Sequence, residues 1–277
     1  MARNLNGMVV LITGASAGIG RRLACDLHAR GANLVLCARR AEKLIEVQRQ
    51  LDGKPLCLPA DVSSPVDCDR VVASTVERFG RLDTLVANAG WGAPATVYEQ
   101  PAATARDMFA TNVFGTLDCI RAAVPVMLRQ QRRDGFCGQV MIVSSGAARR
   151  GLPYMGVYSA TKAAQLSLAE ALRVEVMDRG LAVTSVHPIG TETDFFRTAE
   201  ELGQTKIQSP MRRTYRQSVE HVSRCMLRAI ERPRREVWPH TITRVLLAVN
   251  ALFPGIGDAV MRRQKREIDA INAEQAG

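Results

Sequence analysis

Short apolar runs alternate with longer amphipathic stretches along most of this 277-residue chain. A strand that is buried on both faces reads as a continuous apolar run, and helices between such runs indicate βαβ units. The predicted strands are Met8–Ile12, Asn33–Ala38, Thr84–Ala87, Gln139–Val143, Ala182–His187 and Glu236–Trp238. Amphipathic helices are predicted at Arg21–Arg30 and Val157–Met177. The pattern therefore predicts an α/β fold with a doubly wound parallel sheet.

The residues after the first predicted strand form a glycine-rich turn, Thr13–Gly20, with the sequence TGASAGIG. Glycines let a backbone approach a pyrophosphate closely, and the N-terminus of the following helix offers free N–H groups and the positive end of its dipole. The spacing is GxxxGxG and differs from the GxGxxG of the common dinucleotide fingerprint. The turn predicts a phosphate cradle; the alternative is three glycines that serve only the turn.

Two arginines, Arg39 and Arg40, follow the second predicted strand. In a doubly wound sheet the end of this strand meets the adenosine ribose of a dinucleotide, where an acidic residue would accept the 2′-hydroxyl of NAD. Arginines suit the 2′-phosphate of NADP instead. The pair therefore predicts NADP(H) over NAD(H); the alternative is a solvated charge pair that opens the next helix.

Three further segments add polar groups. Asp61-Val62 is placed to meet an adenine ring, and the strand Thr84–Ala87 ends in Asn88-Ala89-Gly90. Asn112 lies in an apolar predicted helix, where asparagine is a poor helix former. Such an asparagine either caps and packs or binds a catalytic water.

The segment Tyr158–Lys162 reads YSATK, and Ser145 precedes Tyr158 by thirteen residues. Positions i and i+4 lie on one face of a helix, so the phenol and the ammonium point into the same site. A neighbouring cation lowers the pKa of a phenol from about 10. The tyrosine can then exchange protons as a general acid/base, with Ser145 holding the oxygen of a reacting carbonyl or alcohol. A YxxxK alone is more often a solvated helix, so the prediction depends on the accompanying motifs.

In combination these motifs resemble those of the short-chain dehydrogenase/reductase family, in the family's order and spacing, from about Asn6 to about Arg197. The resemblance implies a Rossmann-type fold that binds NAD(P)(H), with Tyr158 as the general acid/base. It also implies that Lys162 binds the nicotinamide ribose and lowers the pKa of Tyr158, that Ser145 orients the substrate oxygen, and that Asn112 holds a water in a proton relay. The implied cofactor-binding residues are Gly14, Ser16, Gly18, Ile19, Gly20, Arg39, Arg40, Asp61, Val62, Asn88, Ala89, Gly90, Tyr158, Lys162, Ile189, Thr191 and Thr193.

The chain departs from the family pattern after the sixth predicted strand. The family usually has Pro-Gly there, against the nicotinamide, whereas this chain has Pro188-Ile189-Gly190. The glycine is displaced by one position, which changes the expected backbone geometry around the nicotinamide. Thr193 still falls where the family places a threonine near the carboxamide and the phosphates.

Length and a hydrophobic content of 47% are ordinary for a single domain with one sizeable core. We expect a dinucleotide-binding domain over residues 1–240, with a substrate lid over about 191–225, and a C-terminal helical extension over 241–277 packed on the same domain. Seven cysteines without a CxxC pair indicate free thiols in a reducing compartment, so the expected location is cytoplasmic. No signal peptide or membrane-spanning run is evident, and the four dispersed histidines predict no metal site.

The chain is basic, with a formal net charge of +10 and a pI near 9.7. Most of the excess lies between Thr205 and Arg235, where nine basic residues face only Glu220 and Glu231. No recognition motif or aromatic interleaving supports nucleic-acid binding. The remaining readings are a solvated surface or an anionic partner, such as an acidic lipid surface or a carboxylate- or phosphate-bearing substrate.

These features predict an NADP(H)-dependent oxidoreductase that interconverts a carbonyl and an alcohol. The lid region contains Phe195, Phe196, Met211, Tyr215 and nearby Met226, which favours a hydrophobic or amphipathic substrate. The alternatives are an NAD-dependent alcohol dehydrogenase of the same family, or a non-catalytic cofactor-binding scaffold or redox sensor. Retention of Asn112, Ser145, Tyr158 and Lys162 together argues against the scaffold.

Two helices predict contacts beyond the chain itself. The helix around Val157–Met177 is apolar on more than one side, so we expect a homodimer or homotetramer that covers the second side. The segment Thr241–Arg263 has apolar residues at helical spacing, with basic residues after Pro254-Gly255. It is expected either to pack over the substrate pocket or a neighbouring subunit, or to make peripheral contact with an anionic membrane surface.

Overall fold

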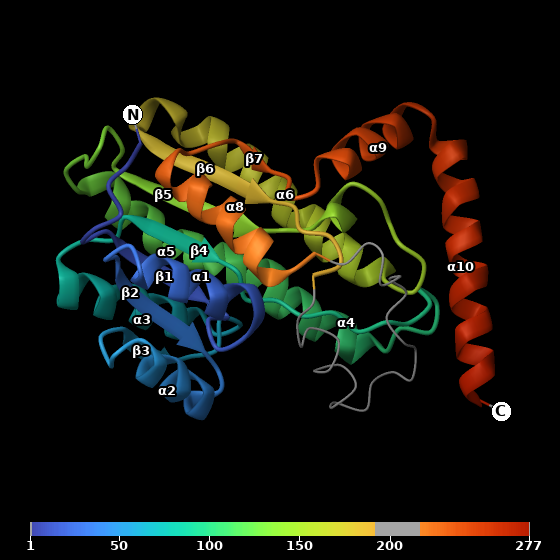
Figure 1. The fold of residues 1–277 in the computed structure, drawn as a ribbon, viewed down its shortest axis with the longest axis horizontal. Coiled ribbons are helices and arrows are strands. Elements are labelled where there is room, and N and C mark those ends of the chain that lie inside the picture. Colours follow the sequence, from blue (N-terminus) through green and yellow to red (C-terminus); the bar gives the residue numbers. More distant parts are fainter. Residues whose placement is uncertain (1, 192–216, 277) are drawn as a thin grey trace.

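In a computed structural model of the chain, residues 2–191 and 217–276 are described. Seven parallel strands form one sheet in the order β3-β2-β1-β4-β5-β6-β7 (Figure 1). The strands are β1 (Val9–Thr13), β2 (Asn33–Ala38), β3 (Leu56–Pro59), β4 (Thr84–Ala87), β5 (Gly138–Val143), β6 (Leu181–Val186) and β7 (Glu236–Val237). The strand order reverses between β1 and β4, which is where doubly wound proteins bind ligands. The predicted α/β fold is confirmed.

Helices cover both faces of the sheet. The helices that follow the strands are α1 (Gly18–His28), α2 (Ala41–Gln50), α3 (Pro65–Phe79), α4 (Ala102–Phe109), α5 (Gly115–Arg129), α6 (Gly156–Val176) and α8 (Val219–Glu231). Shorter turns are η1 (Ala110–Phe114), η2 (Gly146–Ala148) and η3 (Met177–Arg179), and the chain ends in α9 (Thr241–Leu252) and α10 (Pro254–Ala276).

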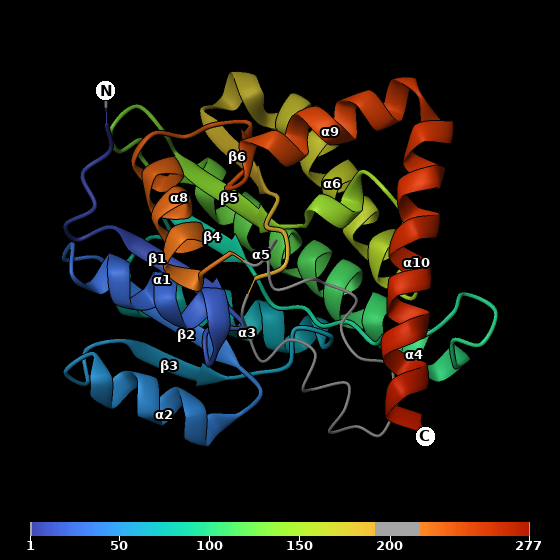
Figure 2. The ribbon, with the colours of Figure 1, turned by 45° about the vertical axis from the view of Figure 1, so that its right-hand side comes forward.

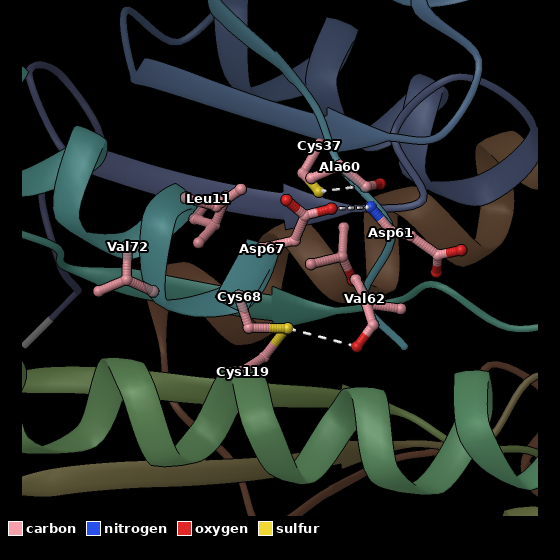
Figure 3. Close-up of a pocket in the computed structure, with 11 residues that line it drawn as sticks. Leu11, Cys37, Ala60, Asp61, Val62, Asp67, Cys68, Val72 and Cys119 are labelled. Carbon is pink, nitrogen blue, oxygen red and sulfur yellow. Dashed lines mark hydrogen bonds between the residues drawn. The ribbon is translucent and has the colours of Figure 1, made fainter. Parts of the chain in front are cut away.

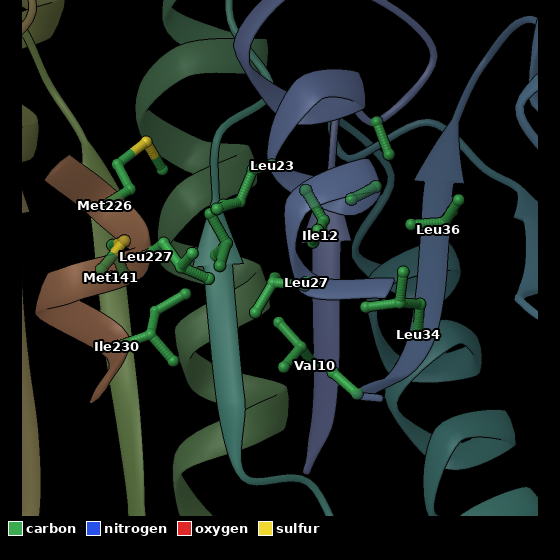
Figure 4. Close-up of a cluster of buried hydrophobic side chains, with 14 of the residues drawn as sticks. Val10, Ile12, Leu23, Leu27, Leu34, Leu36, Met141, Met226, Leu227 and Ile230 are labelled. Atoms are coloured by element: carbon green, nitrogen blue, oxygen red, sulfur yellow. The ribbon is translucent and has the colours of Figure 1, made fainter. Parts of the chain in front are cut away.

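Two apolar cores hold these layers together. On one face, Leu23 and Leu27 of α1 and Ile230 of α8 pack on Val10 and Ile12 of β1 (Figure 4). On the other face, α3, α5 and α6 cover the strands, with Cys119, Ala123 and Ala169 among the buried residues. Because every residue of β1 is buried, this central strand is apolar throughout, as the sequence pattern required.

Most element predictions are close to the observed bounds. The strands other than β3 lie within one residue of the predictions at each end. The prediction missed β3, whose four residues are only partly buried and too short for a clear apolar run. Asn112 was expected in a regular helix and lies instead in the π-helical turn η1, which joins α4 to α5.

The C-terminal helices leave the sheet after β7. Figure 2 shows α9 leading away from the sheet and α10 turning back past the end of the domain. Helix α10 contacts the loop before α6: Tyr154 donates a hydrogen bond to Asp269, Arg150 pairs with Asp258, and Ile268 is 2% exposed. These contacts place α9 and α10 beside the carboxyl ends of the strands.

Candidate active site

A cavity of about 930 Å³ lies at the carboxyl ends of the strands and extends to α9 and α10. Sixteen of the predicted site residues line it, namely Gly14, Ser16, Gly18, Ile19, Arg39, Arg40, Asp61, Val62, Asn88, Ala89, Gly90, Ser145, Tyr158, Lys162, Ile189 and Thr191. Gly20 and Asn112 do not line it, and Thr193 lies outside the described residues. The structure thus brings together residues from six strand ends.

The glycine turn after β1 packs tightly on the end of β4. Gly14 has φ +64°, and a Cβ there would lie 2.9 Å from the Cα of Ala89. A Cβ on Gly20 would lie 2.6 Å from the Asn88 amide nitrogen, which donates to the carbonyl of Thr13 at 2.9 Å. Gly14 and Gly20 are therefore needed for close packing at the switch point, and Gly20 acts below the cavity rather than in its wall.

Helices α3 and α5 support the part of the cavity wall that Asp61 and Val62 form. The backbone N–H of Asp61 donates to Asp67 at 2.9 Å, and the carbonyl of Val62 accepts from the thiol of Cys68 at 3.3 Å (Figure 3). Cys68 lies 3.6 Å from Cys119 of α5, sulfur to sulfur. Helices α3 and α5 thus hold the backbone of Asp61 and Val62 in place.

The two arginines after β2 both line the cavity. The guanidinium of Arg39 lies 4.0 Å from the carboxylate of Asp61, and its side chain is 57% exposed. An exposed ion pair at this distance holds its partners only weakly, so Arg39 is available to an anionic ligand at modest cost.

The residues predicted to be catalytic meet at one wall of the cavity. The Ser145 hydroxyl hydrogen-bonds to Tyr158, and Ser145 accepts from the backbone N–H of Ala147 at 3.1 Å. The neighbouring Ser144 is buried and donates to the carbonyl of Lys162 at 2.8 Å. Of the two serines, Ser145 is therefore the one that faces the tyrosine.

The ammonium of Lys162 is held inside the fold. It donates to the carbonyl of Val143 at 3.0 Å and to the side chain of Gln165 at 2.8 Å. Burial lowers the pKa of Lys162 to about 7. Desolvation raises the pKa of Tyr158 to about 12, although the hydrogen bond from Ser145 opposes this.

The structure shows no lowering of the pKa of Tyr158 by Lys162, and the expected influence of the lysine on the phenol stays a prediction. The ammonium lies 5.6 Å from the centre of the tyrosine ring, and it donates its hydrogen bonds to Val143 and Gln165. With its own charge destabilised by burial, Lys162 offsets little of the desolvation of the phenol. Tyr158 is accordingly a protonated hydrogen-bond donor at neutral pH.

Asn112 is fully buried beside this wall. Its amide accepts from the backbone N–H of Trp91 at 3.0 Å and donates to the carbonyl of Trp91 at 2.9 Å and to Thr161 at 3.0 Å. The side chain thus ties the loop after β4 to α6. This packing role was one of the two alternatives for Asn112; its water-holding role stays a prediction.

The segment after β6 shows what the displaced glycine does. The Ile189 side chain packs on Gly146, where a Cβ would lie 2.6 Å from it. The backbone N–H of Ile189 donates to the Gln217 side chain at 3.1 Å, and the Gln217 N–H donates to the carbonyl of Gly190 at 3.0 Å. The Thr191 hydroxyl is buried without a partner among the described residues. Gln217 was missed because nothing in its sequence context marks it.

His187 packs behind the cavity wall that carries Ser145. Its ring contacts the carbonyl of Ser145 at 3.3 Å and the hydroxyl of Ser185 at 3.0 Å, and it stacks on Trp238 at 4.2 Å between ring centres. Burial lowers the pKa of His187 to about 4, so the ring is neutral at neutral pH. His187 is therefore a core residue bonded to the backbone.

The residues expected to form the lid are only partly described. Phe195, Phe196, Met211 and Tyr215 lie outside the described residues. Met226 was wrongly placed near the pocket: it is fully buried in α8, against the sheet. Its position in an amphipathic helix, four residues before Ile230, could have indicated a core role.

The fold and the cavity define an α/β oxidoreductase of the Rossmann type. The family model described as short chain dehydrogenase matches residues 8–202. The chain therefore belongs to the short-chain dehydrogenase/reductase family, whose members act on alcohol and carbonyl groups with a nicotinamide nucleotide.

Individual proteins agree with this assignment. The chain is 43% identical over 182 residues to 11-beta-hydroxysteroid dehydrogenase 1A of Arabidopsis thaliana, covering 63% of this chain and 50% of the relative. A short-chain dehydrogenase/reductase from Burkholderia phymatum, solved with NAD, has the same fold, with a TM-score of 0.79, 23% identity and coverage of 92% and 96%. A 3-ketoacyl-(acyl-carrier-protein) reductase from Brucella melitensis, solved with NADH, gives a TM-score of 0.73 at 25% identity, with coverage of 84% and 97%. The chain spans about half the length of the curated relative.

Proposed function

We propose that the chain is an NADP(H)-dependent oxidoreductase that interconverts a carbonyl and an alcohol on a hydrophobic or amphipathic substrate. The observation that carries this proposal is the hydrogen-bonded pair of Ser145 and Tyr158 in the wall of the cavity that the glycine turn also lines. Proton-transfer groups and a phosphate cradle in one cavity are what such a reaction requires.

The residues present fit a dinucleotide. Gly14 leaves no room for a side chain between the turn and Ala89, which keeps the backbone N–H groups accessible to phosphates. At the other end, the buried Thr191 hydroxyl has no partner among the described residues, and a nicotinamide carboxamide or a phosphate would supply one. Lys162 would hold the nicotinamide ribose.

Arg39 and Arg40 support NADP(H) rather than NAD(H). Both line the cavity at the end of β2, where no acidic side chain is present to accept a ribose hydroxyl from this strand end. The two solved neighbours named above hold NAD and NADH, so the choice of NADP(H) is specific to the residues of this chain.

The chemistry divides between the cofactor and the chain. When bound, the nicotinamide supplies or accepts the hydride. Ser145 donates a hydrogen bond to the substrate oxygen and stabilises the negative charge that develops on it. The Tyr158 hydroxyl gives its proton to that oxygen in the reduction and takes it back in the oxidation. Because the pKa of Tyr158 is raised to about 12, the phenol holds its proton at neutral pH. Tyr158 can therefore act as the general acid, which suits carbonyl reduction.

The wall opposite the tyrosine indicates the substrate class. It is formed by apolar side chains of α9 and α10, namely Leu246, Leu247, Val249, Ile256, Val260 and Met261. A relative at 43% identity is named a hydroxysteroid dehydrogenase, which fits an apolar alcohol or ketone of this kind. We therefore propose a bulky apolar ketone or secondary alcohol.

A spectrophotometric screen tests the proposal. The purified chain is mixed with NADPH and a panel of apolar and polar ketones and aldehydes, and the nicotinamide absorbance is followed. Oxidation of NADPH that depends on an apolar carbonyl supports the proposal. Tight NADPH binding without turnover on any carbonyl, or on any alcohol with NADP, would identify a cofactor-binding scaffold instead.

A further inference from the structure

Large exposed apolar side chains gather in the C-terminal helices. Eight of them fall in one stretch of nineteen residues, namely Ile242, Val245, Leu246, Val249, Leu252, Phe253, Ile256 and Val260. Leu252 is 75% exposed and Phe253 is 58% exposed. Scattered apolar residues on a surface are normal, but a contiguous apolar patch indicates an interaction site.

The residues of α9 lie on one side of the helix. Ile242, Leu246, Val249 and Phe253 follow i, i+4, i+7, i+11 spacing, so they share a face. None of the residues of α9 is buried. The half-buried residues Thr243, Leu247 and Asn250 lie on the adjacent side of the helix and line the cavity together with Leu246 and Val249. Helix α9 therefore lies over the cavity, as one of the expected alternatives has it, while most of its apolar face stays exposed on the described part of the chain.

Positive charge lies next to this face. Arg263 follows Ile256 and Val260 at helical spacing, so the three share one side of α10. Arg262 and Arg266 are exposed and have no ion pair among the described residues. Arg263 pairs with Glu267 at 3.4 Å, so Arg262 and Arg266 are the cations that complement a surface that is apolar inside and anionic outside.

The apolar face also continues into the cavity. Leu246, Val249, Ile256 and Val260 are between 39% and 62% exposed, and all four line the cavity. A rigid protein partner on this face would cover the opening between them. A fluid lipid surface would cover the same side chains and still admit an apolar substrate, so the continuity favours lipid.

We propose that α9 and the start of α10 dock the chain on the surface of an anionic membrane. The apolar side chains enter the boundary between headgroups and acyl chains, and Arg262 and Arg266 contact lipid phosphates. Among the described residues no single helix is long and apolar enough to cross a membrane; α9 and α10 meet that test only jointly, with a bend of 119° between them. An interfacial position fits this bent arrangement. The choice of lipid over a protein partner rests on the proposed apolar substrate, whereas vesicle binding is measured without turnover, so the two proposals can fail separately.

Vesicle sedimentation of the full chain tests the docking. With phosphatidylcholine vesicles that contain phosphatidylglycerol, we expect binding at low ionic strength and at least about tenfold weaker binding near 1 M salt, where the Debye length falls to about 3 Å. Pure phosphatidylcholine vesicles should bind at least about tenfold more weakly than the anionic ones. No binding to anionic vesicles at low ionic strength would overturn the proposal.

Matched variants distinguish vesicle binding through the docking face from nonspecific binding. Leu252→Asp should weaken vesicle binding at least about tenfold, because it puts a charge among the exposed apolar side chains of α9 without touching the cavity. Val66→Asp is the control, since Val66 of α3 is also 75% exposed and should bind as the wild type does. The double change Arg262→Glu/Arg266→Glu should abolish the salt-sensitive part of the vesicle binding. The double change Arg49→Glu/Arg129→Glu alters the net charge equally and should weaken vesicle binding far less.

The same variants test whether a second copy of the chain, instead of a membrane, covers this face. If a second copy covers this face, Leu252→Asp will lower the mass measured by light scattering and leave vesicle binding unchanged. That result, or equal binding by Leu252→Asp and Val66→Asp, would overturn the membrane assignment. Circular dichroism that matches the wild type shows that each variant is folded, and reduced vesicle binding by a folded Leu252→Asp chain of unchanged mass supports the proposal.

Discussion

The ammonium nitrogen of Lys162 lies 5.6 Å from the centre of the Tyr158 ring, yet it donates hydrogen bonds to Val143 and Gln165. The distance is short enough for a charge on the lysine to influence the phenol, but burial lowers the pKa of Lys162 to about 7. The pair is therefore arranged so that the tyrosine keeps its proton until a ligand changes the surroundings of both groups.

Tyr158→Phe tests the proton-transfer role. The change removes the hydroxyl and keeps the ring, so we expect kcat to fall about 10²–10⁴-fold. The Kd for NADPH should change little, because the hydroxyl is assigned to the substrate oxygen. Steady-state kinetics and a fluorescence titration measure the two quantities. Tyr154→Phe is the control, since that hydroxyl bonds Asp269 of α10, and turnover of Tyr158→Phe within twofold of wild type would refute the mechanism.

Lys162→Met should affect both binding and turnover. The variant keeps most of the side-chain volume but removes the donor assigned to the nicotinamide ribose and leaves the Gln165 side-chain oxygen without its donor. We expect the Kd for NADPH to rise and kcat to fall, each by at least about tenfold. A variant with altered kcat and an unchanged Kd would show that the lysine acts only through the tyrosine.

Arg39→Asp should shift the preference from NADPH towards NADH. It removes a cation that can pair with a 2′-phosphate and supplies an acceptor for a ribose hydroxyl. Loss of a hydrogen bond to a charged group weakens binding by about 1.5–3 kcal/mol, or at least about tenfold in the Kd for NADPH. Arg49→Asp, on the outer side of α2, should leave both Kd values unchanged. A wild-type chain that prefers NADH in competition titrations would contradict the assignment of Arg39.

Much of this site could be predicted because its motifs are local in sequence. The glycine turn, the arginines after β2 and the YSATK helix each follow an apolar run, and parallel strands bring their carboxyl ends to one edge. The pKa values could not be predicted in the same way. Spacing places Lys162 on the same helix face as Tyr158, but only the packing shows that Val143 and Gln165 take its hydrogen bonds.

The contacts that escaped prediction are long-range or depend on shape. Gln217 meets Ile189 across 28 positions of sequence, and Asn112 bonds Trp91 and Thr161 from a π-helical turn that no apolar period reveals. The exposed face of α9 was visible as a pattern, but the pattern alone could not say which surroundings cover it. Apolar periodicity shows that a face needs covering and leaves the covering element undetermined.

His187 should make stability depend on pH. Burial lowers its pKa from 6.5 to about 4, so between these values the unfolded chain binds a proton that the folded chain does not. Stability contributed by the neutral ring is therefore complete above pH 6.5 and is lost as the pH falls towards 4, by roughly 3 kcal/mol in all. Urea unfolding across this range should show the slope, and His187→Gln should remove it. An identical slope in the variant would place its origin in other groups.

The outer side of α6 should be covered by a second copy of the chain. Leu166, Ala169 and Val176 are buried on one side of the helix, whereas Val174 is 70% exposed on another. Covering such a side removes apolar area from water, and a symmetric pair of helices does so with one self-complementary surface. Light scattering should therefore give a mass above 30.3 kDa at micromolar concentration, and Val174→Asp should lower it. Val66→Asp, at a residue of α3 that is 75% exposed, should leave the mass unchanged. A wild-type mass of a single chain would contradict the prediction.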